Sequence, residues 1–385
     1  MKFEKLFGKL KKVKWSHYIS YVVIAAVLAV FMITGNIKMS VAFLLEKIGI
    51  SIILAVSLSF VVGFLGELSL GHAGFMCIGA YIGGKMSSVL VGGMGNTVWA
   101  LIISVLVGGV CAAVAGFIIG LPALRLKGDY LAIVTLAFGQ ITLIIFQNSS
   151  DSSFGGAFGL STPRFDYHSM YIVIFVFALL TIAAFQNVIR SKHGRAITAI
   201  RDSEIAARAT GIPVTRYKLF TFVLSSFFAG IAGVLYSYTQ SKVQSVHFGY
   251  GYSIEILVMV VLGGMGSLNG SIAAAALITF LNEKLSTVLT GKLAVLQNIF
   301  YSLILIIIVI YSNAPAFKNI REKYNFKKFA EKIRKRNDPS RISDDGGSWS
   351  RIPTKIKMDE LLSVDVNINM SQVDGGDDFQ GGGEK

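Results

Sequence analysis

Charged side chains are scarce in this sequence: Asp, Glu, Lys and Arg make up 15% of its 385 residues, and 53% of the residues are hydrophobic. A soluble globular chain carries about 25% charged residues. The mean hydropathy of +0.63 agrees with this apolar excess. The composition excludes a cytosolic enzyme, a nucleic-acid-binding domain and a disordered protein.

Cysteine is nearly absent, since only Cys77 and Cys111 occur and both lie inside apolar runs. Such a pair provides neither a disulfide framework nor the spacing of metal ligands. The phosphate-binding motif G-x-x-x-x-G-K-[ST] is missing as well. We therefore expect no metal and no cofactor in this chain, and no ATP-hydrolysing motor.

Acidic residues are also few, 22 Asp and Glu against 36 Lys and Arg, which gives a net charge of +14. In a soluble protein this excess would favour a nucleic-acid partner. In a chain this apolar it is typical of basic loops on the cytoplasmic side of a membrane.

Long uncharged runs account for most of the sequence. Nine runs without Asp, Glu, Lys or Arg cover residues 15–37, 48–66, 68–84, 86–124, 130–150, 167–189, 219–241, 256–282 and 293–317. A helix needs roughly 20 apolar residues to cross a hydrocarbon core of about 30 Å. The alternation of membrane β-strands is absent, so the runs predict a bundle of transmembrane helices.

Two of these runs contain glycine-rich interruptions. The run 86–124 opens with an expected loop at 91–96, so its helix is predicted at 97–120. The run 256–282 is interrupted from Gly263 onward, so one helix is predicted to end near 263 and another to cover about 270–290. The sequence thus predicts an all-α polytopic membrane protein with about ten transmembrane helices, some of them broken or re-entrant.

Basic residues indicate the orientation of these spans. The N-terminal segment 1–17, the loop 190–217 and the tail 317–385 all contain Lys or Arg, and even numbers of predicted spans separate them. Because basic loops stay in the cytoplasm, both termini are expected there. The permease domain is then expected at 18–316, followed by a tail that is basic and then Gly/Asp-rich, which is typical of disorder.

Polar residues interrupt the apolar sequence at two places between predicted spans. One cluster contains Glu67, Ser69 and His72, and the other covers residues 263–271. Because broken helices at membrane depth line cavities or are buried in protein, both clusters favour a translocation path. A structural role stays open for His72, bonded locally at a helix end, and for Glu67, which would complement a helix N-terminus.

The loop 190–217 is the long polar segment inside the expected permease domain. Asp202 or Ser203 is expected to cap a short helix that has Glu204 in its first turn and ends at Gly211. Its small apolar face suits either a groove in a partner protein or lipid head groups.

Acids in apolar surroundings are few, namely Glu67, Glu255 and Glu283. A carrier driven by protons or sodium usually places charged residues in its helices. Their scarcity favours an energy source outside the chain.

Four segments in consistent order resemble the branched-chain amino acid ABC transporter permeases: 67–81, 124–139, 194–212 and 253–268. Segment 124–139 is similar to one that marks the M-type (LivM-type) of the two permeases in such a transporter. Segment 194–212 resembles the loop by which these permeases dock onto their ATPases. The resemblance extends over about residues 40–312 and departs from the family at Gln140, where Glu is frequent.

This resemblance implies a permease subunit of an ABC importer in the plasma (inner) membrane, carrying branched-chain, hydrophobic amino acids across the lipid bilayer. The implied partners are a second homologous permease, two ABC ATPases that hold ATP and Mg, and an extracytoplasmic solute-binding protein. The residues expected to couple to the ATPases are Gly194, Arg195, Asp202, Glu204, Ala206, Ala207, Arg208 and Gly211. Those expected along the translocation path are Glu67, Ser69, Gly71, His72, Gly74, Gln140, Glu255, Gly263, Gly264 and Gly266.

Two other functions stay open at this point. A permease of the same family would carry urea or another short amide, because the binding protein sets much of the specificity. A secondary amino acid carrier driven by an ion gradient would instead work without ATPases.

Overall fold

The structure is a computed structural model that describes residues 39–95, 98–126, 128–164 and 167–288, together with residues 302, 303 and 306. These residues belong to the first of the two units into which the chain divides, Met1–Asn313. The expected first span (15–37), the tail (317–385) and nearly all of the expected last span (293–317) lie outside the described residues.

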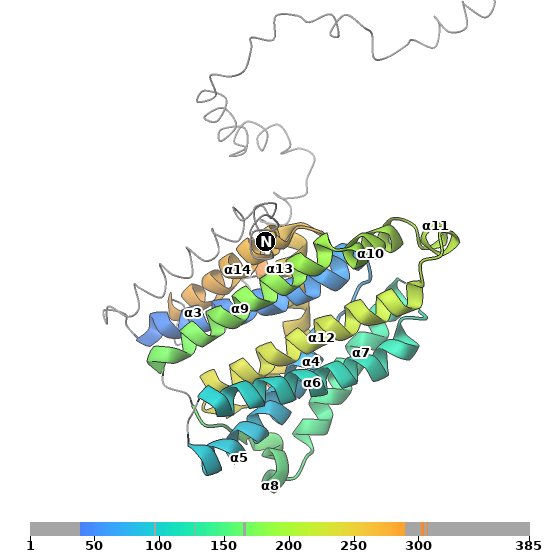
Figure 1. Ribbon diagram of the computed structural model, residues 1–385. Helices are drawn as coiled ribbons and strands as arrows, with labels where there is room; N and C mark the ends of the chain where they lie inside the picture. The colour runs from blue at the N-terminus through green and yellow to red at the C-terminus, as the bar shows by residue number, and fades with distance from the viewer. Residues whose placement is uncertain are drawn as a thin grey trace, which may run out of the picture. The chain divides into compact units, whose positions relative to one another are not determined.

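The described residues are mostly helical, and the longer helices lie side by side (Figure 1). In chain order the elements are α3 (Met39–Ser59), η1 (Phe60–Leu65), α4 (His72–Ile78), η2 (Gly79–Gly83), α5 (Gly84–Met94), α6 (Val98–Ala123), α7 (Asp129–Gln147), α8 (Asp151–Phe154), η3 (Gly156–Phe158), β1 (Leu160–Ser161), α9 (Tyr167–Arg190), α10 (Lys192–Asp202), α11 (Glu204–Ala209), α12 (Val214–Thr239), β2 (Lys242–Val243), η4 (Ser245–Phe248), α13 (Tyr250–Gly263) and α14 (Leu268–Val288). Helix α9 packs against α3, and α6 packs against α12. Strands β1 and β2 form one short antiparallel pair.

Among the described residues, six helices are long and apolar enough to cross a membrane. They cover Met39–Leu65, His72–Gly93, Val98–Ala123, Asp129–Gln147, Met170–Arg190 and Val214–Thr239. Each corresponds to one of the uncharged runs, which confirms a helical, multi-pass membrane protein. The total of about ten spans and the side on which the termini lie stay predictions.

The interruption of the run 256–282 is confirmed, because α13 ends at Gly263 and α14 begins at Leu268. Helix α13 has 14 residues, or about 21 Å at 1.5 Å per residue, which is too short to cross a core of about 30 Å alone. The expected loop at 91–96 is wrong in part. Helix α5 continues to Met94 and stops at Gly95, whose φ of 73° L side chains rarely adopt.

Helix α3 and its π-helical continuation η1 form the most enclosed part of the bundle. Every residue from Gly49 to Leu65 is buried. The continuation ends at Gly66, which has a φ of 81°. Single turns of π-helix occur frequently at functional sites, and η1 lies in contact with α10, at the charged end of the bundle.

Small residues allow α12 to lie very close to its neighbours. A Cβ on Gly79 of η2 would lie 2.1 Å from the carbonyl oxygen of Gly230, and one on Gly233 would lie 2.0 Å from that of Met76. Because lipid provides no hydrophobic force between helices, close backbone approach of this kind stabilises membrane bundles. The four-residue spacing of Gly79 and Gly83 is therefore a packing feature.

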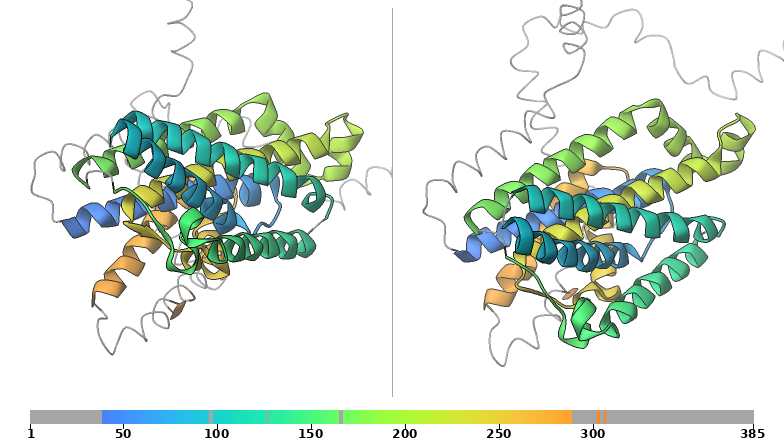
Figure 2. Two further views of the ribbon diagram at one scale, coloured as in Figure 1. Left: turned by 90° about the horizontal axis from the view of Figure 1, so that it is seen from below. Right: turned by 60° about the horizontal axis from the view of Figure 1, so that its bottom comes forward.

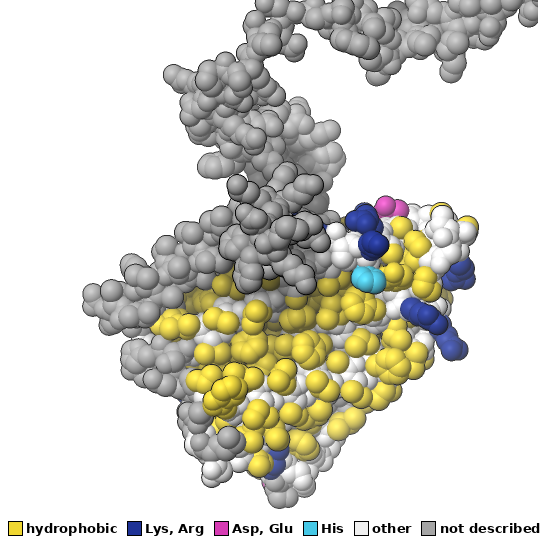
Figure 3. Space-filling model, viewed as in Figure 1, with side chains coloured by type: hydrophobic (Ala, Val, Ile, Leu, Met, Phe, Trp, Pro, Cys, Tyr) yellow, Lys and Arg dark blue, Asp and Glu magenta, His cyan; other side chains and the backbone are white. Residues whose placement is uncertain are grey.

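The outward face of α6 is apolar along its length. Its exposed large side chains are Val98, Trp99, Leu106, Val110, Val114, Phe117, Ile118 and Leu121. Figure 3 shows hydrophobic side chains over most of this face of the bundle, with most of the visible Lys and Arg at the end that carries α10 and α11. These two helices stay at one end in the further views (Figure 2). Extended exposed apolar surface of this kind fits lipid or a partner in the membrane.

Candidate functional site: a charged junction and a polar pocket

The segment 190–217 contains two helices, where the sequence predicted one. The hydroxyl of Ser191 caps α10 by accepting hydrogen bonds from the backbone N–H groups of His193 (3.1 Å) and Gly194 (3.4 Å). Ile197 and Ile200 are spaced three residues apart on one face and are buried against the bundle. Helix α10 was missed because this pattern is short and is embedded in basic residues.

The predicted limits of α11 are confirmed. Ser203 is its cap, accepting a hydrogen bond from the N–H of Ala206 at 3.3 Å. Gly211 has a φ of 83°, and its N–H donates to the carbonyl of Arg208 at 3.1 Å. The next N–H, that of Ile212, donates to the carbonyl of Ala207 at 3.1 Å, which is the glycine-terminated end known as the Schellman motif.

Helix α11 presents apolar side chains away from the bundle. Ile205 is 82% exposed, and Ala206 and Ala209 are exposed beside it, whereas Ala207 faces inward and is buried. A helix this short is marginal alone in water. Its position must therefore come from contacts with the rest of the protein.

One such contact is a cluster of three charges around a buried lysine, which we call the junction: Glu67, Glu204 and Lys218. Lys218 on α12 is 4% exposed, and its Nζ donates to Glu67 Oε1 at 2.5 Å and to Glu204 Oε2 at 3.2 Å. Glu204 also pairs with Arg208 at 2.8 Å on the exposed side of α11. Since buried charges require partners, the junction fixes α11 to α12 and to the segment after η1.

Arg201 adds a second contact between this end and the broken helices. Its Nη1 donates to the carbonyl of Gly63 at 3.1 Å, while its Nε and Nη2 donate to Asp202. Gly63 lies within η1, and a Cβ on it would lie 2.5 Å from the backbone nitrogen of Gly266. Gly264 and Gly266 have φ values of 90° and 85° and form the turn between α13 and α14. Helix α10, η1 and this turn therefore meet at one point.

The other expected path residues lie in packed surroundings. His72 is 2% exposed, and its Nε2 lies 2.8 Å from the hydroxyl of Ser57. A Cβ on Gly71 would lie 2.2 Å from the carbonyl oxygen of Thr135, and one on Gly74 would lie 2.8 Å from the Cα of Gly139. The partner of His72 is thus a side chain on α3 and not the local backbone group that the structural interpretation expected, while the glycine contacts join α4 to α7. A path role for this group, which also includes Ser69 and Gln140, stays a prediction.

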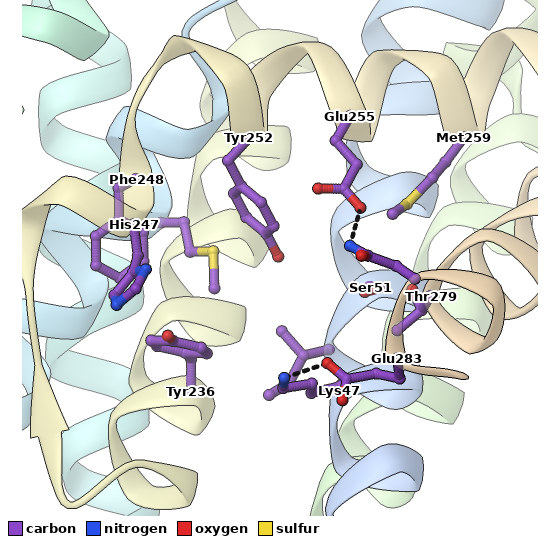
Figure 4. Close-up of a pocket in the computed structure, with 13 residues that line it drawn as sticks. Lys47, Ser51, Tyr236, His247, Phe248, Tyr252, Glu255, Met259, Thr279 and Glu283 are labelled. Atoms are coloured by element: carbon purple, nitrogen blue, oxygen red, sulfur yellow. Dashed lines mark hydrogen bonds and ion pairs between the residues drawn. The ribbon is translucent and has the colours of Figure 1, made fainter. Parts of the chain in front are cut away.

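A cavity of about 260 Å³ lies among α3, α4, α12, η4, α13 and α14 (Figure 4). Its lining residues are Lys47, Ile50, Ser51, Met76, Tyr236, His247, Phe248, Tyr252, Glu255, Met259, Thr279, Asn282 and Glu283. Of the expected path residues, Glu255 is in this set. Tyr236 follows Lys218 of the junction by 18 residues on α12, or about 27 Å, so the pocket and the junction lie toward opposite ends of that helix.

Both signs of charge occur in this pocket. Lys47 on α3 forms an ion pair with Glu283 on α14. The Nδ2 of Asn282 donates to Glu255 Oε1 at 3.2 Å. Figure 4 shows Tyr252 and Glu255 projecting from α13 toward the residues of α14 and α3. Charged groups within membrane segments mark substrate and ion pathways.

Sequence reasoning missed the two cations on which these sites depend. Lys47 and Lys218 each stand immediately before an uncharged run, 48–66 and 219–241, and so resemble flanking residues. The structure places both inside helices. Each Lys lies beside another charged residue near one end of its helix, Glu46 in α3 and Arg216 in α12, and the acid that pairs with it lies far away in the sequence.

A protein-family model for the branched-chain amino acid transport system / permease component matches residues 40–309. The high-affinity branched-chain amino acid transport system permease protein LivM of Salmonella typhimurium is 35% identical over 287 residues, which are 65% of this chain and 66% of that protein. The chain thus spans just under two thirds of the length of this LivM protein. The ribose import permease protein RbsC of Escherichia coli is 24% identical over 285 residues, or 70% and 84% of the two chains.

The LivH permease protein of the high-affinity branched-chain amino acid transport system of Escherichia coli is 25% identical over 252 residues, 61% of this chain and 81% of that one. The family match covers more than half of the chain and includes nearly all of the segment from α3 to α14. The chain thus belongs to the family of permease components of branched-chain amino acid transport systems, and within it resembles the LivM type.

Proposed function

We propose that this chain is a permease subunit of an ABC importer that carries branched-chain amino acids across the plasma membrane, with energy supplied by partner ATPases. The observation that carries the proposal is α11. Its apolar face is exposed while its other side is fixed to the membrane helices through the buried Lys218. A short, firmly attached helix with an unpartnered apolar face suits a groove in a partner protein.

The proposed assembly contains a second homologous permease, two ABC ATPases that hold ATP and Mg, and an extracytoplasmic solute-binding protein. The similarity to both LivM and LivH supports two related permeases. ATP-driven closure of the ATPases would move α11. The junction transmits that motion to Glu67 and α12, and Arg201 transmits it to η1 and the α13–α14 turn, so that the permeases alternate between two states.

The identity of the transported substrate differs among the relatives of this chain. Relatives named for branched-chain amino acids and for ribose are both similar to this chain. Urea and other short amides are the second candidate class within the same fold. A secondary carrier is less favoured, because such a carrier does not need α11.

The first prediction concerns uptake in cells with and without the chain, using labelled leucine, isoleucine, valine, urea and ribose. An ionophore collapses the ion gradients while glycolysis maintains ATP. We expect chain-dependent uptake of the three amino acids to persist under the ionophore. Loss of uptake with the gradient would establish a secondary carrier, and uptake of urea or ribose alone would replace the substrate while leaving the transporter class intact.

The second prediction concerns Gly211, which follows α11 with a positive φ and has no atom within 4 Å of the position that a Cβ would take. Because space is available, Gly211→Val acts through backbone strain, roughly 1–3 kcal/mol for a non-glycine residue in this region. We expect a loss of more than half of uptake with normal amounts of protein in the membrane. Gly251→Ala is the control, since Gly251 also has open space but no positive φ. Unchanged uptake by Gly211→Val would argue against a coupling role.

A further inference from the structure

We propose that the pocket among α3, α12, α13 and α14 binds the charged head group of a free α-amino acid, with Lys47 facing its carboxylate and the acids on α13 and α14 facing its ammonium group. This inference rests on the proposed function. It goes beyond that function by assigning the site within the bundle and the chemical features of the solute that the site recognises.

The charges of the pocket match those of a zwitterion. Lys47 provides one positive charge, and Glu255 and Glu283 provide negative charges, from three different helices around one cavity. An ammonium group has three N–H donors, so Lys47 can keep its ion pair with Glu283 and still donate to a ligand carboxylate. A carboxylate has about four acceptor positions, so Glu255 can accept from Asn282 and from a ligand ammonium.

A buried hydroxyl in the pocket independently indicates a ligand. Thr279 is 7% exposed, and its Oγ1 has no hydrogen-bond partner within the described part of the chain. Buried polar groups are ordinarily hydrogen-bonded, and an exception requires a reason. A ligand carboxylate or ammonium group in the cavity would provide the missing partner.

The rest of the lining is suited to an apolar side chain. Ile50, Met76, Phe248 and Met259 line the same cavity and are buried. The volume of about 260 Å³ falls just below the roughly 300–1,000 Å³ of pockets for drug-sized ligands, so the cavity suits a small molecule. A sugar offers no charged group to Lys47 or to the two acids, and urea would leave the apolar part of the cavity unfilled.

The inference is tested by protection of an introduced thiol in membranes that contain the full chain. Ser51→Cys is a small change in the pocket lining, and the parent chain corrects for modification of Cys77 and Cys111. The rate of modification by a small polar thiol reagent is measured with leucine, leucinamide, 4-methylpentanoate or ribose. We expect leucine to slow modification, the amide and the acid to require at least about tenfold higher concentration, and ribose to have no effect.

Substitutions in the same background test the residues. We expect Lys47→Met to weaken protection by leucine at least about tenfold. Thr279→Val, which replaces the hydroxyl by a methyl group, is expected to weaken it several-fold. Lys284→Met is the matched control, because Lys284 is exposed on α14 and is not part of the lining. It should leave protection unchanged.

The outcomes separate this inference from the proposed function. Equal protection by leucine and leucinamide, protection by ribose alone, or full protection in Lys47→Met would overturn the inference, whatever the uptake assay shows. A lack of ATP-driven uptake together with zwitterion-specific protection would refute the proposed function and support the site. Absence of protection of a reactive Ser51→Cys thiol by every compound would overturn the inference while leaving an uptake result intact. A thiol that never reacts would show that polar solutes do not reach the cavity, which would overturn the inference as well.

Discussion

Replacing Lys218 by Met is expected to abolish transport while leaving the chain inserted in the membrane. Lys218 is the cation between Glu67 and Glu204, at 2.5 and 3.2 Å from their carboxylate oxygens. Its removal leaves two partly buried carboxylates near each other, of which Glu204 keeps its ion pair with Arg208. Breaking a buried ion pair by removing one partner costs roughly 3–5 kcal/mol. Because this cost falls on the contact proposed to carry the motion of α11, we expect uptake to fall to the level of cells without the chain.

The effect should be specific to coupling. The pocket residue Tyr236 lies about 27 Å from Lys218 along α12, so leucine protection of the thiol introduced by Ser51→Cys should persist in Lys218→Met. Arg216→Met is the matched control, because Arg216 is an exposed cation two residues earlier on the same helix, and it should retain most of the uptake.

A rescue experiment identifies the cause of the loss. If the unpaired carboxylate of Glu67 causes it, adding Glu67→Gln to Lys218→Met should restore part of the uptake. Equal defects in the single and double variants would show that Lys218 acts in another way. Normal uptake by Lys218→Met itself would remove the junction from the mechanism.

The second large effect is expected for Gly79→Ala, the smallest change possible at that position. The added Cβ would lie 2.1 Å from the carbonyl oxygen and 2.6 Å from the Cα of Gly230. Both atoms belong to backbone, so the clash is relieved only by separating η2 from α12. Overpacking of this kind costs about 1–3 kcal/mol or more. We expect a clear decrease in the midpoint of thermal unfolding in detergent and less protein in the membrane.

Gly92→Ala provides the comparison for this variant. Gly92 belongs to the same candidate span, His72–Gly93, and a Cβ there meets no atom within 4 Å. Since alanine favours helix over glycine by up to about 1 kcal/mol, Gly92→Ala should unfold at the same or a higher temperature. If both variants unfold at the same temperature as the parent chain, backbone contact at Gly79 does not stabilise the bundle.

The sequence predicted those features that depend on neighbouring residues. Uncharged runs located the six long helices, the glycines at 263–266 located the break before α14, and Ser203 and Gly211 located the ends of α11. Each of these signals is local, because helix periodicity, caps and turns depend on residues a few positions apart. Family motifs extended the prediction to the permease class.

Local sequence patterns could not predict the charge pairs of the junction and of the pocket. Glu67 and Lys218 are separated by 151 positions, and Lys47 and Glu283 by 236. Each residue alone resembles the charged edge of a span. Pairing depends on the order in which helices pack, which periodicity does not determine. From its sequence neighbours, Glu67 was predicted to lie along the translocation path, and that role stays a prediction. Its contact with Lys218 in the junction was not predicted.

The length of α12 has a consequence for how transporters of this kind diversify. A single helix separates the pocket proposed to bind the solute from the junction proposed to couple to the ATPases, so we expect that mutations at one end need not be compensated at the other. Substitutions in the pocket could then change the transported solute while the proposed coupling to the ATPases is retained. If the proposed roles hold, this division would explain how similar permeases are named for substrates as unlike as branched-chain amino acids and ribose, and exchange of pocket residues between such relatives would be a route to importers of new solutes.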